Sequence, residues 1–148
     1  MIATFKLTPA LLLLVLGVSE GQKDIGTLKA EAEKASGGQQ AKLYAALADK
    51  LVDVADQQFT QGNSAQGEVT VQEVLQYSGK AHDVALSSHD NRKEVEILLR
   101  QTQRHLENVK RTLAADDRPP LDAVEKKLAD LRQDLLDSMF APKKKDKK

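Results

Sequence analysis

Apolar residues recur at intervals of three and four along four successive stretches of the chain, and this spacing restricts the fold more than any other feature. Residues three and four apart lie on one face of an α-helix, so each stretch predicts a helix with a single apolar stripe. The expected helices cover about 39–61, 66–87, 91–113 and a last segment that follows Pro119. Their stripes consist of Leu43, Tyr44, Leu47, Ala48, Leu51, Val54, Ala55 and Phe59; Val71, Val74, Leu75, Ser78, Ala81, His82 and Ala85; Val95, Leu98, Leu99, Thr102, Leu106, Val109 and Leu113; and Leu121, Val124, Leu128, Leu131 and Leu135.

Each apolar stripe must be buried, and the chain offers only other helices against which to bury it. No window alternates apolar and polar residues as a half-buried strand would. The chain contains no cysteine, which excludes disulfides, thiol catalysis and thiolate metal sites. Because the connecting turns are short, we predict an all-α, single-domain, antiparallel helical bundle of four main helices plus a short N-terminal helix.

Several local signals mark the ends of these helices. The segment Lys23–Ala35 predicts the short N-terminal helix, and Ser36-Gly37-Gly38 ends it, so residues 22–38 form a short helix with a glycine-rich linker before the bundle at 39–140. Gly62 marks a helix stop, and Asn91 with Glu94 three residues later predicts a capping box. The spacing of Leu121 to Leu135 is that of a coiled-coil seam, and the last two helices are the likeliest tight hairpin.

The segment LTPALLLLVLGVSEG near the N-terminus predicts export. Its apolar run is about a dozen residues, whereas a membrane-spanning helix needs about 20. Lys6 precedes the run, and the small residues Ser19 and Gly21 follow it, as in a secretory signal peptide of residues 1–21 that is cleaved before Gln22. We therefore expect a periplasmic or extracellular protein. The alternatives are a membrane anchor that stays uncleaved and a buried segment of the fold.

Charge is distributed unevenly along a chain whose formal net charge is zero. Residues 141–148 hold five lysines and one aspartate and predict a disordered basic tail, consisting of Lys143, Lys144, Lys145, Lys147 and Lys148. Without leader and tail, 16 basic and 20 acidic side chains remain, a net charge of −4. An acidic body has no general attraction for phosphates, so we expect no nucleic-acid partner. The tail could contact an anionic membrane surface, or it could be inert.

One helix face carries a basic ridge, defined here as Lys93, Arg100, Arg104 and Arg111. These four residues fall on one side of the expected helix, opposite its apolar stripe. Such a ridge could bind an acidic partner or anionic headgroups. Glu96 and Glu107 each lie four residues before an arginine of the ridge, which is the spacing of intrahelical ion pairs, so an ordinary solvated face is the alternative.

Other polar residues give weaker signals. His82 and His89 are two helical turns apart, about 10 Å along an axis, which is too far for one metal ion. His105 has no obvious partner. The acidic line of Asp49, Asp53 and Asp56 lacks the glycine-containing loop of calcium sites and is expected to be solvated. We expect neither metal nor cofactor.

The sequence contains none of the motifs that build common active sites: no nucleophile elbow, no glycine-rich phosphate loop and no paired histidines. We therefore expect an exported, non-catalytic helical protein that binds another cell-envelope protein, or a second copy of itself, and no small-molecule substrate. The alternative is a peripheral membrane-surface protein held by the basic tail and the basic ridge.

Overall fold

A computed structural model describes residues 20–141 of the chain. All secondary structure in this range is helical: α1 (Glu20–Lys34), α2 (Gly37–Thr60), α3 (Ser64–Ser88), α4 (Arg92–Thr112), the short 3₁₀ helix η1 (Ala115–Asp117) and α5 (Pro119–Phe140). The predicted all-α class is confirmed, and the expected helices agree with the observed ones to within a few residues. Residues 1–19 of the expected signal peptide and the lysines of the expected tail lie outside the described residues.

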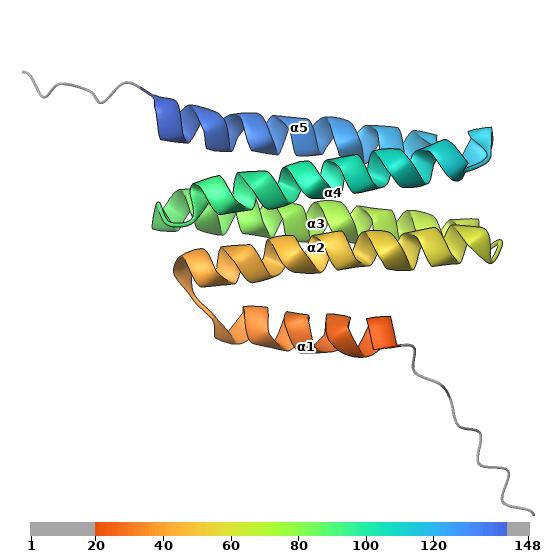
Figure 1. Cartoon of the computed structure of the whole chain (residues 1–148), viewed down its shortest axis with the longest axis horizontal. Helices are drawn as coiled ribbons and strands as arrows, with labels where there is room; N and C mark the ends of the chain where they lie inside the picture. The colour runs from red at the N-terminus through yellow and green to blue at the C-terminus, as the bar shows by residue number, and fades with distance from the viewer. Residues whose placement is uncertain (1–19, 142–148) are drawn as a thin grey trace, which may run out of the picture.

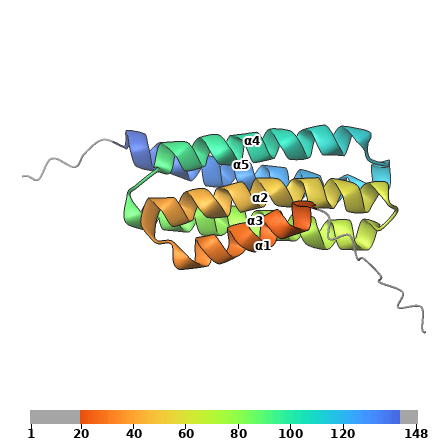
Figure 2. The same cartoon turned by 60° about the horizontal axis from the view of Figure 1, so that its bottom comes forward.

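The helices lie side by side along the long axis of the molecule (Figures 1 and 2). The connections α2–α3 and α4–α5 are at one end, and α1–α2 and α3–α4 are at the other (Figure 1). Helix α2 contacts α1, α3 and α4, and α5 contacts α3 and α4. Helix α1 packs along α2 and buries Ala32 completely, so the short N-terminal helix is docked and not free.

The predicted stripes face one another in a single apolar cluster. Every stripe residue is buried or half-buried. Helices α4 and α5, the likeliest tight hairpin by their spacing, do pack together, but the most extensive contact is between α2 and α3. Small residues explain this result, because Ala41, Ala45 and Ala48 of α2 and Ala81 and Ala85 of α3 are buried and let the two backbones approach closely.

Glycine determines the α2–α3 turn. Gly62 has a φ angle of +82°, and its N–H donates to the carbonyl of Phe59 at 3.0 Å. The N–H of Asn63 donates to the carbonyl of Gln58 at 2.8 Å. These two hydrogen bonds form a Schellman motif, which satisfies the last carbonyls of α2. The stop predicted at Gly62 is therefore confirmed.

The α3–α4 turn differs from the prediction. Asn91 precedes α4, but its backbone is left-handed (φ 55°) and its side chain makes no capping hydrogen bond, so the predicted capping box with Glu94 is wrong. A capping side chain needs an extended backbone at this position. The connection between α3 and α4 reverses the chain within three residues, and it does so with left-handed conformations at both His89 and Asn91.

Two glycines provide a matched stability test. We expect Gly62→Ala to lower the free energy of unfolding by about 1 kcal/mol, because alanine is strained at positive φ. We expect Gly79→Ala, inside α3, to raise it by roughly 0.5–1 kcal/mol, because a Cβ there would meet no atom within 4 Å and alanine favours the helix. Urea unfolding followed by circular dichroism measures both. Equal signs for the two variants would contradict this account of the glycines.

Candidate functional site

A groove of about 550 Å³ lies between the first half of α4 and the last turns of α5. It is called the α4/α5 groove below, and it is lined by Lys93, Glu96, Ile97, Arg100, Leu136, Met139 and Phe140. Among residues 25–141, whose side chains the structure describes, large apolar side chains are exposed at only three positions, and two of them line this groove. These are Ile97, 37% exposed, and Phe140, 79% exposed; the third is Val69 on α3.

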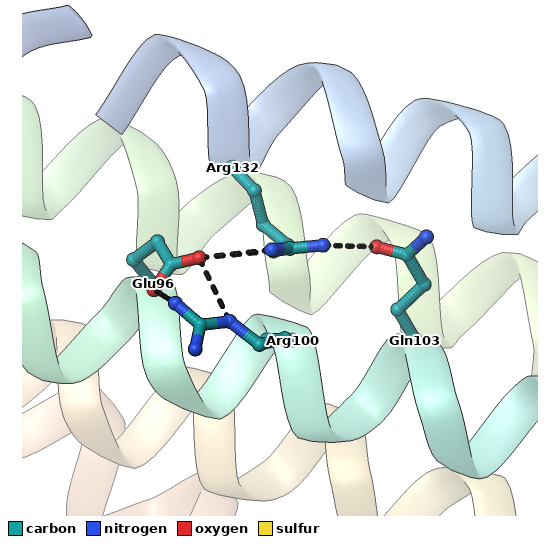
Figure 3. A network of polar contacts seen from close by, with 4 residues as sticks. All are labelled: Glu96, Arg100, Gln103 and Arg132. Atoms are coloured by element: carbon teal, nitrogen blue, oxygen red, sulfur yellow. Dashed lines mark hydrogen bonds and ion pairs between the residues drawn. The ribbon is translucent and has the colours of Figure 1, made fainter. Parts of the chain in front are cut away.

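A buried carboxylate that lines the α4/α5 groove is held in a network of polar contacts (Figure 3). Glu96 is only 2% exposed. Arg100, one helical turn later, donates from Nε to Glu96 Oε1 at 3.2 Å and from Nη2 to Oε2. Arg132 of α5 donates from Nε and Nη2 to Oε1, both at 3.1 Å, and from Nη1 to Gln103 Oε1 at 2.7 Å. This Glu96 network joins α4 to α5 and satisfies both oxygens of the buried acid.

The network carries an excess of positive charge. Two guanidinium groups share one carboxylate, and Arg100 Nη1 makes no hydrogen bond within the described part of the chain. Arg100 is 40% exposed at its side chain, so this nitrogen can be reached from solvent. Lys93 is exposed and has no ion-pair partner among the side chains of residues 25–141. The rim of the groove is therefore cationic around an apolar centre.

The basic ridge predicted from the sequence is only partly brought together. Lys93 and Arg100 line the groove, whereas Arg104 and Arg111 are exposed elsewhere on α4. Both predicted intrahelical pairs form: Arg100 with Glu96, and Arg111 with Glu107 at 2.9 Å. The burial of Glu96 was not predicted.

The sequence analysis also missed the contribution of α5, because nothing in the sequence pairs Arg132 with Glu96. The signal available in the sequence was Phe140, a large apolar residue near the end of the last helix that does not belong to the heptad-like stripe.

A second groove, of about 410 Å³, lies between α3 and α5. Its charged lining is balanced, with Lys80 and Lys127 against Asp83 and Asp130. None of the exposed large apolar side chains of residues 20–141 lines it. Of these two grooves, it is the α4/α5 groove that combines exposed apolar area with unbalanced charge.

His105, for which the sequence showed no obvious partner, lies between two carboxylates. Its Nδ1 is 3.2 Å from Asp49 Oδ1, and its Nε2 is 3.1 Å from Asp53 Oδ1. Two members of the predicted acidic line are therefore used in a contact between α2 and α4. Sequence spacing could not reveal this contact because it depends on which helices are neighbours.

The other two histidines lie in different surroundings. His82 is buried, with Nδ1 2.8 Å from Asp83 Oδ1 and Nε2 3.3 Å from Asp134 Oδ2 of α5. His89 is exposed and ends α3 in a left-handed conformation. Among the described side chains, those of residues 25–141, no three histidine, aspartate or glutamate side chains are grouped so that they could hold a metal ion.

A lysine joins α4 and α5 at the end away from the groove. Lys110 Nζ donates to Asp122 Oδ1 at 2.7 Å and to Glu125 Oε2 at 2.6 Å. These hydrogen bonds, first that to Asp122 and then that to Glu125, raise the pKa of Lys110. At the groove end, Arg92 Nη1 donates to the carbonyl of Ser138 at 3.0 Å. The two helices that form the groove are therefore fixed to each other at both ends.

None of the helices in residues 20–141 has both the length and the hydropathy needed to cross a bilayer. Comparisons of the chain with protein-family models, with curated proteins and with solved structures found no match.

Proposed function

We propose that this protein is an exported, antiparallel helical bundle that acts without catalysis, by binding another protein of the cell envelope through the α4/α5 groove. The observation that carries the proposal is the gathering of Ile97 and Phe140 beside a cationic rim. Apolar and aromatic side chains surrounded by polar groups, with arginine among them, are the composition of protein-binding surfaces.

The exposure of Phe140 supports a role in binding. A phenylalanine that is 79% exposed contributes little to the stability of the fold, because most of its apolar area stays in water. Its burial by a partner would remove that large apolar area from water. Single exposed apolar residues are ordinary on protein surfaces. Here Phe140 adjoins Ile97, Leu136 and Met139 in one groove, and contiguous apolar area of this kind is typical of interaction sites.

The state of Glu96 supports a role without catalysis. It is the one acid that lines the groove, and both of its oxygens already accept hydrogen bonds from arginines. A general acid or base must be free to reach a substrate proton. The groove side chains therefore suit recognition better than proton transfer.

Capture from native envelope extract, with gentle cross-linking, tests this proposal. The full chain should retain a specific protein, and the double variant Ile97→Ser with Phe140→Ser should lose it. Val69→Ser is the matched control, because Val69 is 52% exposed on α3, outside the groove. Recovery of the chain alone, or equal capture by the double variant, would overturn the proposal.

The alternative function, a peripheral membrane-surface protein, makes a different prediction for the full chain and the groove variants. It requires binding to anionic vesicles that weakens as salt rises and is lost on deletion of residues 143–148. Loss of a protein partner in the Ile97 and Phe140 variant, with no vesicle binding by the full chain, would support the groove over this alternative.

A further inference from the structure

We infer that the segment recognised by the α4/α5 groove is an acidic amphipathic peptide, with an apolar side chain that enters the groove and carboxylates that contact Arg100 and Lys93. This inference rests on the proposed function, because it assigns the chemistry of the partner to the same groove. It is carried by the charge balance and the geometry of the Glu96 network.

The charge balance favours an anionic partner. The charged residues that line the groove are Lys93, Arg100 and Glu96. Glu96 is buried and is also bonded to Arg132, so its charge is more than neutralised inside the protein. The exposed charges of the rim are then those of Lys93 and Arg100, and like-charged partner residues would be repelled while carboxylates would be attracted.

The geometry prepares Arg100 for a carboxylate. Nε and Nη2 of this residue are both bonded to Glu96, which fixes the plane of the guanidinium group (Figure 3). Its Nη1 is left without a hydrogen bond in the described part of the chain, and the side chain is 40% exposed. Binding a carboxylate therefore requires little loss of side-chain freedom, which is the main cost of ordering an arginine.

The apolar lining of the groove requires that the bound peptide also carry a large apolar side chain. Ile97 and Phe140 line the groove together with the half-buried Leu136 and Met139. A volume of about 550 Å³ can receive one or two large side chains, and the flexible side chain of Met139 can adapt to such an anchor. A helix that places leucines beside glutamates, at the spacing of one turn, would satisfy the centre and the rim together.

The test uses fluorescent helical peptides and the full chain. The first probe carries leucines on one face and glutamates beside them; in the second probe lysines replace the glutamates, and in the third glutamines replace them. We expect anisotropy to report binding of the glutamate peptide, with an affinity about tenfold above that of the glutamine peptide. The lysine peptide should not bind. Binding of the glutamate peptide should weaken as salt rises.

Two matched charge variants test whether the glutamate peptide binds at the groove. Lys93→Gln should weaken binding of the glutamate peptide severalfold, whereas Arg104→Gln should leave it unchanged. Both changes remove one exposed positive charge from α4, but Arg104 does not line the groove. Arg100→Lys keeps the charge and loses the planar fork, so it should also weaken binding. Lys93 is exposed and makes no hydrogen bond or ion pair with the side chains of residues 25–141, so Lys93→Gln remains informative even if changes at Arg100 impair folding.

Three outcomes would overturn the inference. The first is equal binding of the glutamate and glutamine peptides, and the second is an equal effect of Lys93→Gln and Arg104→Gln. The third is binding of anionic vesicles, and not of the peptide, with the same dependence on Lys93. If these peptides fail while Ile97 and Phe140 still determine capture from envelope extract, the acidic partner is excluded and the proposed function stands.

Discussion

Replacement of Arg132 by methionine is expected to lower the free energy of unfolding by about 2–3 kcal/mol, because it leaves the buried carboxylate of Glu96 with one cation in place of two. Arg132 provides two hydrogen bonds to that carboxylate from α5. Glu96 is 2% exposed and cannot exchange the lost bonds for water. Urea unfolding followed by circular dichroism measures the change.

Replacement of the acid of the network, in place of one of its arginines, is the control for this prediction. Glu96→Gln should cost less, about 1 kcal/mol, because the side chains of Arg100 and Arg132 are 40% and 22% exposed and can be solvated. The double change Glu96→Leu with Arg132→Met should be milder than Arg132→Met alone, since it removes the buried charge together with its partner. A larger loss for Glu96→Gln than for Arg132→Met would show that the burial of Glu96 is not what makes the network important.

Leu99→Ala is expected to have the other large effect, a loss of about 3 kcal/mol in the free energy of unfolding, whereas Ile97→Ala should cost less than about 1 kcal/mol. Both residues are on α4, two positions apart. Leu99 is completely buried in the apolar cluster, and Ile97 is 37% exposed beside the groove. Thermal or urea unfolding of the two variants compares them directly.

The pair also separates folding from binding. Leu99→Ala removes packing and leaves a cavity, so its effect on partner capture should follow the fraction of folded protein. Ile97→Ala should leave the protein folded and weaken capture. If Ile97→Ala proved as destabilising as Leu99→Ala, Ile97 would belong to the core and could not be assigned to a binding surface.

The apolar stripes could be predicted from the sequence because helical burial repeats at a local spacing. The residues from Leu43 to Phe59 and from Val95 to Leu113 lie where that spacing predicts, and Gly62 and Pro119 mark helix ends by their own backbone preferences. Information of this kind is contained within one helix. It needs no knowledge of which helix is the neighbour.

The polar contacts depend on neighbours and could not be predicted. Glu96 and Arg132 are on different helices, as are His105 and Asp49. Glu96 has an unremarkable place in the sequence, as the first member of an intrahelical pair, and only the approach of α5 buries it. Lys93 and Arg100 could be assigned to a candidate face because one helix carries both, but their apolar partners on α5 required the fold.

Photo-cross-linking inside the native cell envelope tests the central claim most directly. A photoreactive amino acid replaces Phe140 in one chain and Val69 in another, both of which are exposed positions. Illumination is expected to join the chain labelled at position 140 to one discrete partner protein, and the chain labelled at position 69 to none. A discrete adduct from position 69 with none from position 140 would contradict the claim that the α4/α5 groove is the binding surface.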